Sequence, residues 1–213
     1  MAALAELVAR PGKPAPVAPV LAAERLLPVT AALEAVLPQR GLQRGSTVHV
    51  TSTGAAGATS LALELLVGIS MSGSWCAVAG CPSLGLAAAA ERGVELGRLL
   101  VVPELGGEGR WQQVVASLFD AVDAVVLAPP PSVRPADARR LVARARDRRS
   151  VFVVLDHRGR WPGPADLRCG VTASSWNGLG KGHGLLRART IQVEVSGRGA
   201  AARPRSAPLS LSA

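Results

Sequence analysis

Residues 41–66 read GLQRGSTVHVTSTGAAGATSLALELL, and this stretch decides the fold class. Its first half contains the β-rich run STVHVTS, and its last part, TSLALELL, favours a helix. The glycine-rich segment between them predicts a tight turn that leads from a strand into a helix. A strand–turn–helix unit of this kind is the framework of a phosphate-binding loop.

The side chains of this loop depart from the working pattern G-x-x-x-x-G-K-[ST]. In that pattern backbone N–H groups surround the phosphates, the lysine contacts the β- and γ-phosphates, and the hydroxyl holds Mg²⁺. The corresponding residues here are Ser52, Gly54, Gly57, Ala58 and Thr59. Gly57 and Thr59 fit, but Ser52 replaces the first glycine and Ala58 stands where the lysine should be. We therefore expect no ATP hydrolysis, because nothing offsets the charge of the transition state.

Two readings of the loop stay open. Backbone amides at a helix N-terminus do not depend on the missing side chains, so residual anion binding is one of them. A Gly/Ala-rich turn that never held phosphate is the other.

The metal side of such a site is missing as well. The run VDAVVLA should end in an aspartate that orients Mg²⁺, but it ends in Ala128, and Asp123 stands at its start. A catalytic glutamate would be expected near residues 80–84, where the sequence is GCPSL. Three independent losses predict a protein without catalytic residues, bound metal or cofactor.

Outward from this unit the pattern of strand and helix repeats. The predicted strands are 46–52, 75–80, 98–103, 123–131 and 150–157. Residues 54–70 are predicted as a loop and helix, and further helices are predicted at 84–94, 111–122 and 135–149. These strands are apolar runs separated by helices, which is typical of a mostly parallel sheet covered on both faces. After residue 160 the segments CGVTASSW and LLRARTIQVEV alternate and predict an antiparallel hairpin at the sheet edge. The expected fold is a three-layer αβα domain of the α/β class.

The two ends of the chain differ from this domain in composition. Residues 1–18 read as a short amphipathic helix followed by a Pro-rich linker, and residues 197–213 read as a disordered basic tail. The domain itself is expected over 19–196, beginning with a helical stretch at 21–36 that Pro28 interrupts. Both ends are candidate partner-binding segments. Removal of 1–12 or 197–213 is expected to weaken partner binding if the ends form the interface.

Composition narrows the function classes. The 213 residues carry a net charge of +9, with 22 Arg and 2 Lys, so the chain is attracted to polyanions such as nucleic acid or acidic partners. Four Trp, two Phe and no Tyr leave few platforms for base stacking. The three cysteines form neither a disulfide framework nor a zinc motif. With no signal-like or membrane-spanning segment, we expect a cytoplasmic protein, with association with the nucleoid left open.

The arginines gather in one part of the sequence. The candidate patch for DNA or an acidic partner consists of Arg139, Arg140, Arg144, Arg146, Arg148, Arg149, Arg158 and Arg160. A solvated helix face in an arginine-rich chain is the alternative, and nearby Asp137, Asp147 and Asp156 would soften the field. Trp161 and Trp176 lie in the late loops, near Arg158, Arg160 and Lys181 in the sequence. Together with an arginine they could stack on an exposed base, or they could be hydrophobic caps on the sheet edge.

Several segments resemble the RecA ATPase core. The run of residues 41–66 is similar to its start, GVELGRLLVVP at 93–103 resembles a later turn and strand, and VDAVVLAPP at 122–130 stands at the metal-binding strand. The resemblance covers about residues 25–195 and implies a RecA-like fold. The loops that would grip DNA are short here, PPPSVRPAD after Ala128 and LDHRGRWPGPADLRC after Val154.

A RecA-like domain that lacks ATP chemistry and long DNA loops resembles the ImuA-type accessory proteins, in particular their short form from high-GC Gram-positive bacteria. The resemblance implies a non-catalytic adaptor in damage-induced mutagenesis. Its partners would be an inactive Y-family polymerase-like protein and an error-prone C-family polymerase in translesion synthesis, with direct DNA contact left open.

Two alternatives belong to other classes. One is a cell-division inhibitor of the SulA type, which would block polymerisation of the division GTPase. The other is an ATP-using enzyme with displaced groups, for which Glu104, Glu108 or Lys181 would have to supply the missing chemistry.

Overall fold

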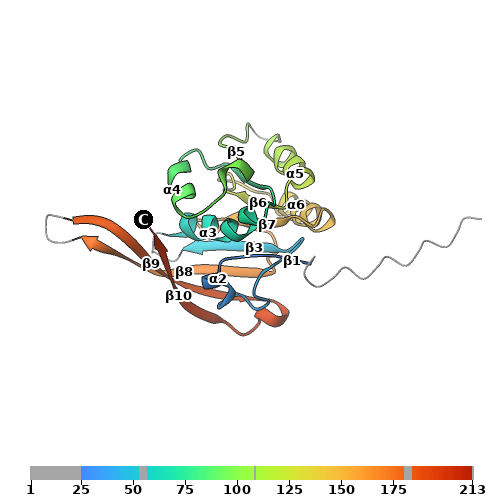
Figure 1. Ribbon diagram of the computed structural model, residues 1–213. Coiled ribbons are helices and arrows are strands. Elements are labelled where there is room, and N and C mark those ends of the chain that lie inside the picture. The colour runs from blue at the N-terminus through green and yellow to red at the C-terminus, as the bar shows by residue number, and fades with distance from the viewer. Residues whose placement is uncertain (1–24, 53–56, 108, 180–183, 213) are drawn as a thin grey trace, which may run out of the picture.

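The computed structural model describes residues 25–52, 57–107, 109–179 and 184–212. Its main feature is an eight-stranded sheet with the order β10-β9-β8-β3-β7-β6-β4-β5 (Figure 1). The strands are β3 (Thr47–Ser52), β4 (Cys76–Ala79), β5 (Leu99–Val102), β6 (Ala124–Leu127), β7 (Val151–Leu155), β8 (Leu167–Leu179), β9 (Gly184–Gly197) and β10 (Arg205–Ser212). Strands β3 to β8 run parallel, whereas β9 is antiparallel to β8 and β10 to β9. The predicted parallel sheet with an antiparallel edge hairpin is confirmed.

Helices cover both faces of this sheet. They are α3 (Ala58–Met71), α4 (Leu86–Glu91), α5 (Trp111–Ala121) and α6 (Pro135–Asp147). Buried residues of α3 and α4 belong to one apolar core, and those of α5 and α6 belong to a second core. Alternate residues of β7 serve the two cores, since Val153 packs with α3 while Phe152 packs with α5 and α6. The three-layer α/β architecture is therefore confirmed.

A short N-terminal unit packs over the outer side of α3. It consists of β1 (Leu26–Leu27), α2 (Ala31–Glu34) and β2 (Leu42–Gln43), with β1 and β2 antiparallel. The helix expected over 21–36 is wrong at residues 26–27, which form β1. The physical reason is Pro28, which disfavours helical backbone in the residue before it. Covered in this way on its outer side, α3 buries apolar residues around most of its circumference.

The C-terminal segment does not behave as predicted. Instead of a disordered tail, residues 205–212 form β10, which pairs along its whole length with β9 (Figure 1). Leu209 and Leu211 are buried against the core that contains α3. The alternating pattern of PLSLS supplies these two leucines to one face of a strand, and the basic, glycine-rich start of the segment hides that signal.

Some predictions fall on residues outside the described ranges. These are the N-terminal helix and linker at 1–18, Gly54 of the loop, Glu108 and Lys181. Among the helices that the structure describes, none combines the length and the apolar character needed to cross a bilayer.

Candidate functional site

The strand and the helix that flank the predicted phosphate loop are present where the sequence predicts them, while residues 53–56 of the loop itself lie outside the described ranges. Strand β3 ends at Ser52, and α3 begins at Ala58 directly after Gly57. Gly57 has φ 141°, a conformation that favours glycine, and a Cβ there would lie 3.1 Å from Ile191 Cγ2. The Ala58 side chain is fully buried. The loop position of the catalytic lysine is thus occupied by a small core residue.

Thr59, which matches the metal-binding hydroxyl, lies beside a histidine. Its Oγ1 is 3.4 Å from His157 Nε2, at the carboxyl end of β7. Within the described ranges, no three His, Cys, Asp or Glu side chains gather in a way that could hold a metal ion. Glu104 is exposed in the loop after β5.

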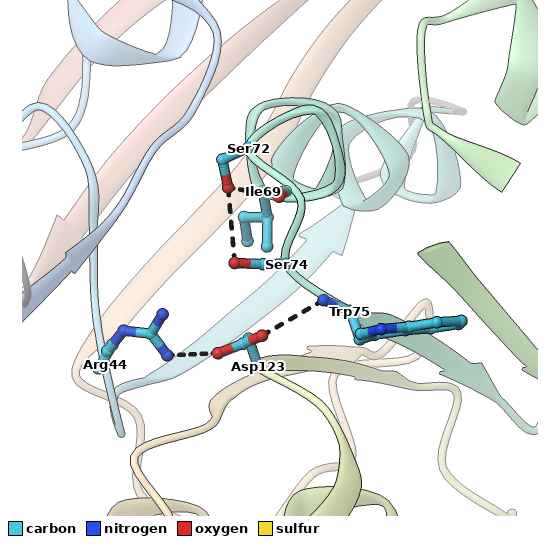
Figure 2. A network of polar contacts seen from close by, with 6 residues as sticks. All are labelled: Arg44, Ile69, Ser72, Ser74, Trp75 and Asp123. Carbon is cyan, nitrogen blue, oxygen red and sulfur yellow. Dashed lines mark hydrogen bonds and ion pairs between the residues drawn. The ribbon is translucent and has the colours of Figure 1, made fainter. Parts of the chain in front are cut away.

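Asp123 lies at the amino end of β6, and the structure shows what it does there (Figure 2). Its Oδ1 accepts a hydrogen bond from Arg44 Nη1 at 2.5 Å, and its Oδ2 accepts one from the Trp75 N–H at 3.2 Å. Arg44 stands just before β3 and Trp75 just before β4. The carboxylate therefore fastens the starts of three strands together, at the sheet edge opposite the phosphate loop, so it cannot orient a metal there.

We expect Asp123→Ala to lower the free energy of unfolding by about 1–3 kcal/mol, because the guanidinium of Arg44 and the Trp75 N–H both lose their charged acceptor. Urea unfolding monitored by circular dichroism measures this loss. Asp147→Ala is the matched control, since Asp147 is exposed on the last turn of α6. An equal loss of stability in the two variants would contradict the role of Asp123 in fastening the three strands.

The predicted arginine patch is divided in two by the fold. On α6 and its end, Arg144 and Arg148 both pair with Asp120 at 2.7 Å. Two further acids lie near α6 arginines: Asp137 of the same helix is 3.9 Å from Arg140, and Asp166 is 3.7 Å from Arg146. These carboxylates offset much of the positive charge. The net positive charge around α6 is therefore smaller than the sequence suggests. Arg139 and Arg149, both exposed, complete this half of the patch.

The other half, Arg158 and Arg160, borders a cavity of about 270 Å³ at the carboxyl ends of β6 and β7. The cavity is lined by Ala128, Pro129, Pro130, Pro131, Val133, Leu155, Asp156, His157, Arg158, Arg160 and Trp161. We call it the rim pocket. Both arginines are exposed, and neither forms an ion pair with any described residue. In α/β proteins, ligands usually bind at the carboxyl ends of the parallel strands.

Asp156 holds the wall of the rim pocket in place. It is 4% exposed and accepts hydrogen bonds from the Trp161 N–H at 2.6 Å and the Arg158 N–H at 3.1 Å. Its Oδ2 is also 3.2 Å from His49 Nε2 in β3. Burial alone would raise the pKa of Asp156, but the hydrogen bonds from Trp161, His49 and Arg158 outweigh it and lower that pKa. The sequence-based interpretation treated Asp156 only as an acid that softens the field of the nearby arginines and missed this role, although an Asp directly after a buried strand was the available signal.

The two tryptophans have different environments. Trp161 is buried in the second core and meets Phe152 edge-on, with ring centroids 5.6 Å apart, so it is a packing residue. Trp176 lies on β8, is 42% exposed, and has the Arg189 guanidinium 4.9 Å from its ring centroid. The two therefore do not form one stacking platform.

The connections that follow β6 and β7 are short. Residues 128–134 lead into α6, and residues 156–166 lead into β8 without a helix. The rim pocket lies between these two connections, so its walls are fixed by the strand ends and the Asp156 hydrogen bonds.

Comparison with known proteins finds a matching family model and a similar protein. Residues 35–163 match the family model of the MT3502 N-terminal domain. The chain is also 35% identical over 149 residues to the uncharacterized protein Rv3395c of Mycobacterium tuberculosis, which covers 68% of this chain and 71% of that protein.

Proposed function

The chain belongs to the MT3502 N-terminal domain family, and we propose that it is a non-catalytic, RecA-like adaptor in damage-induced mutagenesis. It would work in the cytoplasm on translesion synthesis and bind the polymerase-like protein of the mutasome and an error-prone C-family polymerase. This assignment rests on the ImuA-type resemblance of the sequence. The structural observation that supports it is the fully buried Ala58 at the start of α3, at the position where a phosphate loop has its lysine.

The rim pocket is the surface best suited to a protein partner in this proposal. Its lining is mostly apolar side chains from the strand ends and the proline run, and its border carries Arg158 and Arg160 without ion-pair partners among the described residues. An apolar floor with a positive border complements a partner segment that joins an apolar anchor to acidic residues. The partly compensated charge of α6 makes that face less suited to phosphate contacts, so a protein interface is favoured over DNA.

Capture of the purified polymerase-like protein by the full-length chain tests the proposal. We expect the double variant Arg158→Glu/Arg160→Glu to bind at least about tenfold more weakly, because both charges change sign at the border of the pocket. Arg203→Glu/Arg205→Glu is the control, since it makes the same change of charge around the turn into β10. Deletion of 197–213 is a poor test, because it would remove β10 and expose the core.

Three results would each contradict a part of this proposal. Failure of the wild-type chain to bind either polymerase component would remove the adaptor role, whereas equal binding by the Arg158→Glu/Arg160→Glu variant would remove the rim pocket as its interface. ATP turnover that disappears in Glu104→Gln would contradict the non-catalytic assignment.

A further inference from the structure

Two arginines from distant parts of the chain meet on one hydroxyl at the first turn of α3. Arg92, at the end of α4, donates from Nη2 to Ser60 Oγ at 3.3 Å. Arg189, on β9, donates from Nη1 to the same oxygen at 3.4 Å. Two guanidinium groups repel each other, and a neutral hydroxyl compensates neither charge. The arrangement therefore needs a further explanation.

Arg189 is held by several contacts with its guanidinium toward α3. It is only 8% exposed, its Nε donates to Ser174 Oγ at 2.9 Å, and its guanidinium stacks on Trp176. A Cβ on Gly57 would lie 3.5 Å from Arg189 Nη2, so the guanidinium reaches the residue that precedes the helix. Its contacts with Ser174, Ser60 and Trp176 fix its position without supplying a negative charge.

Arg92 is incompletely satisfied. Its Nη1 is buried and has no hydrogen-bond partner in the described part of the chain. Glu64, one turn further along α3, attracts it but accepts its own hydrogen bond from Thr30 Oγ1 at 2.7 Å. Burial lowers the pKa of Arg92, and Arg189 lowers it further, while Glu64 opposes both. Burial also lowers the pKa of Arg189.

The helix adds to this positive charge. Ser60 lies in the first turn of α3, where backbone N–H groups have no partner within the helix and the helix dipole is positive. That turn has no acidic residue and no side-chain cap. Two guanidinium groups and a helix N-terminus thus converge on Ser60. Neither arginine forms an ion pair with any residue that the structure describes.

We propose that Arg92, Arg189 and Ser60 form a binding site for a phosphate-type oxyanion at the first turn of α3. A tetrahedral phosphate can accept hydrogen bonds from two guanidinium forks and from a hydroxyl at once. The cations come from the end of α4 and from β9, so the site does not need the lysine that Ala58 replaces. It goes beyond the adaptor role, and it binds its ligand without hydrolysing it.

Thermal unfolding of the full-length chain tests the site, with sodium phosphate or pyrophosphate compared against sodium chloride at equal ionic strength. A ligand that binds only the folded state raises the melting temperature in a saturable way. We expect this rise for the wild type and for Arg203→Gln, an exposed control arginine in the turn before β10. For Arg92→Gln we expect at least about tenfold weaker phosphate binding by calorimetry, because a charged donor is lost.

A second measurement separates a ligand site from a merely structural arginine. In phosphate-free buffer, Arg92→Gln is expected to be at least as stable as the wild type, because the variant removes the repulsion with Arg189. If Arg92 had a structural role alone, Arg92→Gln would instead lower the stability of the protein and leave its phosphate response intact. Absence of a saturable response in the wild type, or an unchanged phosphate affinity in Arg92→Gln, would overturn the proposal. Partner capture by Arg92→Gln in the same buffer is expected to match the wild type, so the adaptor role is tested separately.

Discussion

Replacement of Asp156 by alanine is expected to lower the free energy of unfolding by about 3–5 kcal/mol, as when one partner of a buried charged network is removed. The Trp161 N–H, the Arg158 N–H and His49 Nε2 would all lose the carboxylate that they contact. Because two of these donors belong to the loop that borders the rim pocket, the variant is also expected to lose partner capture. Urea unfolding and the capture assay measure the two effects.

Asp156→Asn is the matched variant for this prediction. The amide keeps one oxygen acceptor and nearly the same volume, so we expect a smaller loss of about 1–2 kcal/mol, consistent with the loss of charge-assisted hydrogen bonds alone. If Asp156→Ala and Asp156→Asn lowered the free energy of unfolding by equally small amounts, the hydrogen bonds of Asp156 would not be what holds the loop.

The same residue predicts a pH dependence. The pKa of Asp156 is lower in the folded protein than in the unfolded chain, where it is about 3.9. Its contribution is therefore fully present above the unfolded pKa and is lost as the pH falls through the folded pKa. We expect the stability difference between the wild type and Asp156→Asn to shrink below about pH 4, whereas a difference that stays constant would contradict the assignment.

Replacement of Gly68 by alanine is expected to destabilise the protein by about 2–3 kcal/mol. At an exposed helix position the same change would stabilise by about 1 kcal/mol. Here a Cβ would lie 2.6 Å from Val29 Cα and 2.8 Å from the Pro28 carbonyl oxygen, so backbone must move. The expected result is displacement of the β1–α2 unit from α3.

Urea unfolding measures the stability of the Gly68 variant, and hydrogen exchange at Leu33 and Leu37 reports on the β1–α2 unit. Gly107→Ala is the control, because a Cβ at Gly107 meets nothing within 4 Å. A Gly68→Ala variant as stable as this control would show that the close approach of Val29 to α3 is not maintained in solution.

Local pattern was sufficient to predict most of the central sheet. Apolar runs separated by amphipathic helices predicted β3 to β7 and the helices between them, since side-chain periodicity is a property of neighbouring residues. It failed at β10, where two leucines follow a basic, glycine-rich segment. It also failed at residues 26–27, where pairing with Leu42 and Gln43 decides the strand and the partner is distant in sequence.

The candidate site was predicted less completely. The sequence shows Ala58 where the phosphate-loop pattern has its lysine and Ala128 where it has the metal-binding Asp, because those positions are defined relative to one strand and one helix. The charge of the arginine patch was overestimated, because Asp120 and Asp166 reach α6 from other elements. Pockets and ion pairs join segments whose distance in space no local pattern specifies.

The sequence by itself determined the α/β class and the strand and helix of the unit at 46–70, because each depends on residues that are close together in the chain. Only the tertiary structure decided that Asp156 holds the rim pocket and that Arg92 and Arg189 meet at Ser60. The hydrogen bond from Arg189 to Ser60 spans 129 residues, and that from His49 to Asp156 spans 107. Such contacts arise only when the order of strands brings β9 and β7 beside β3 and α3.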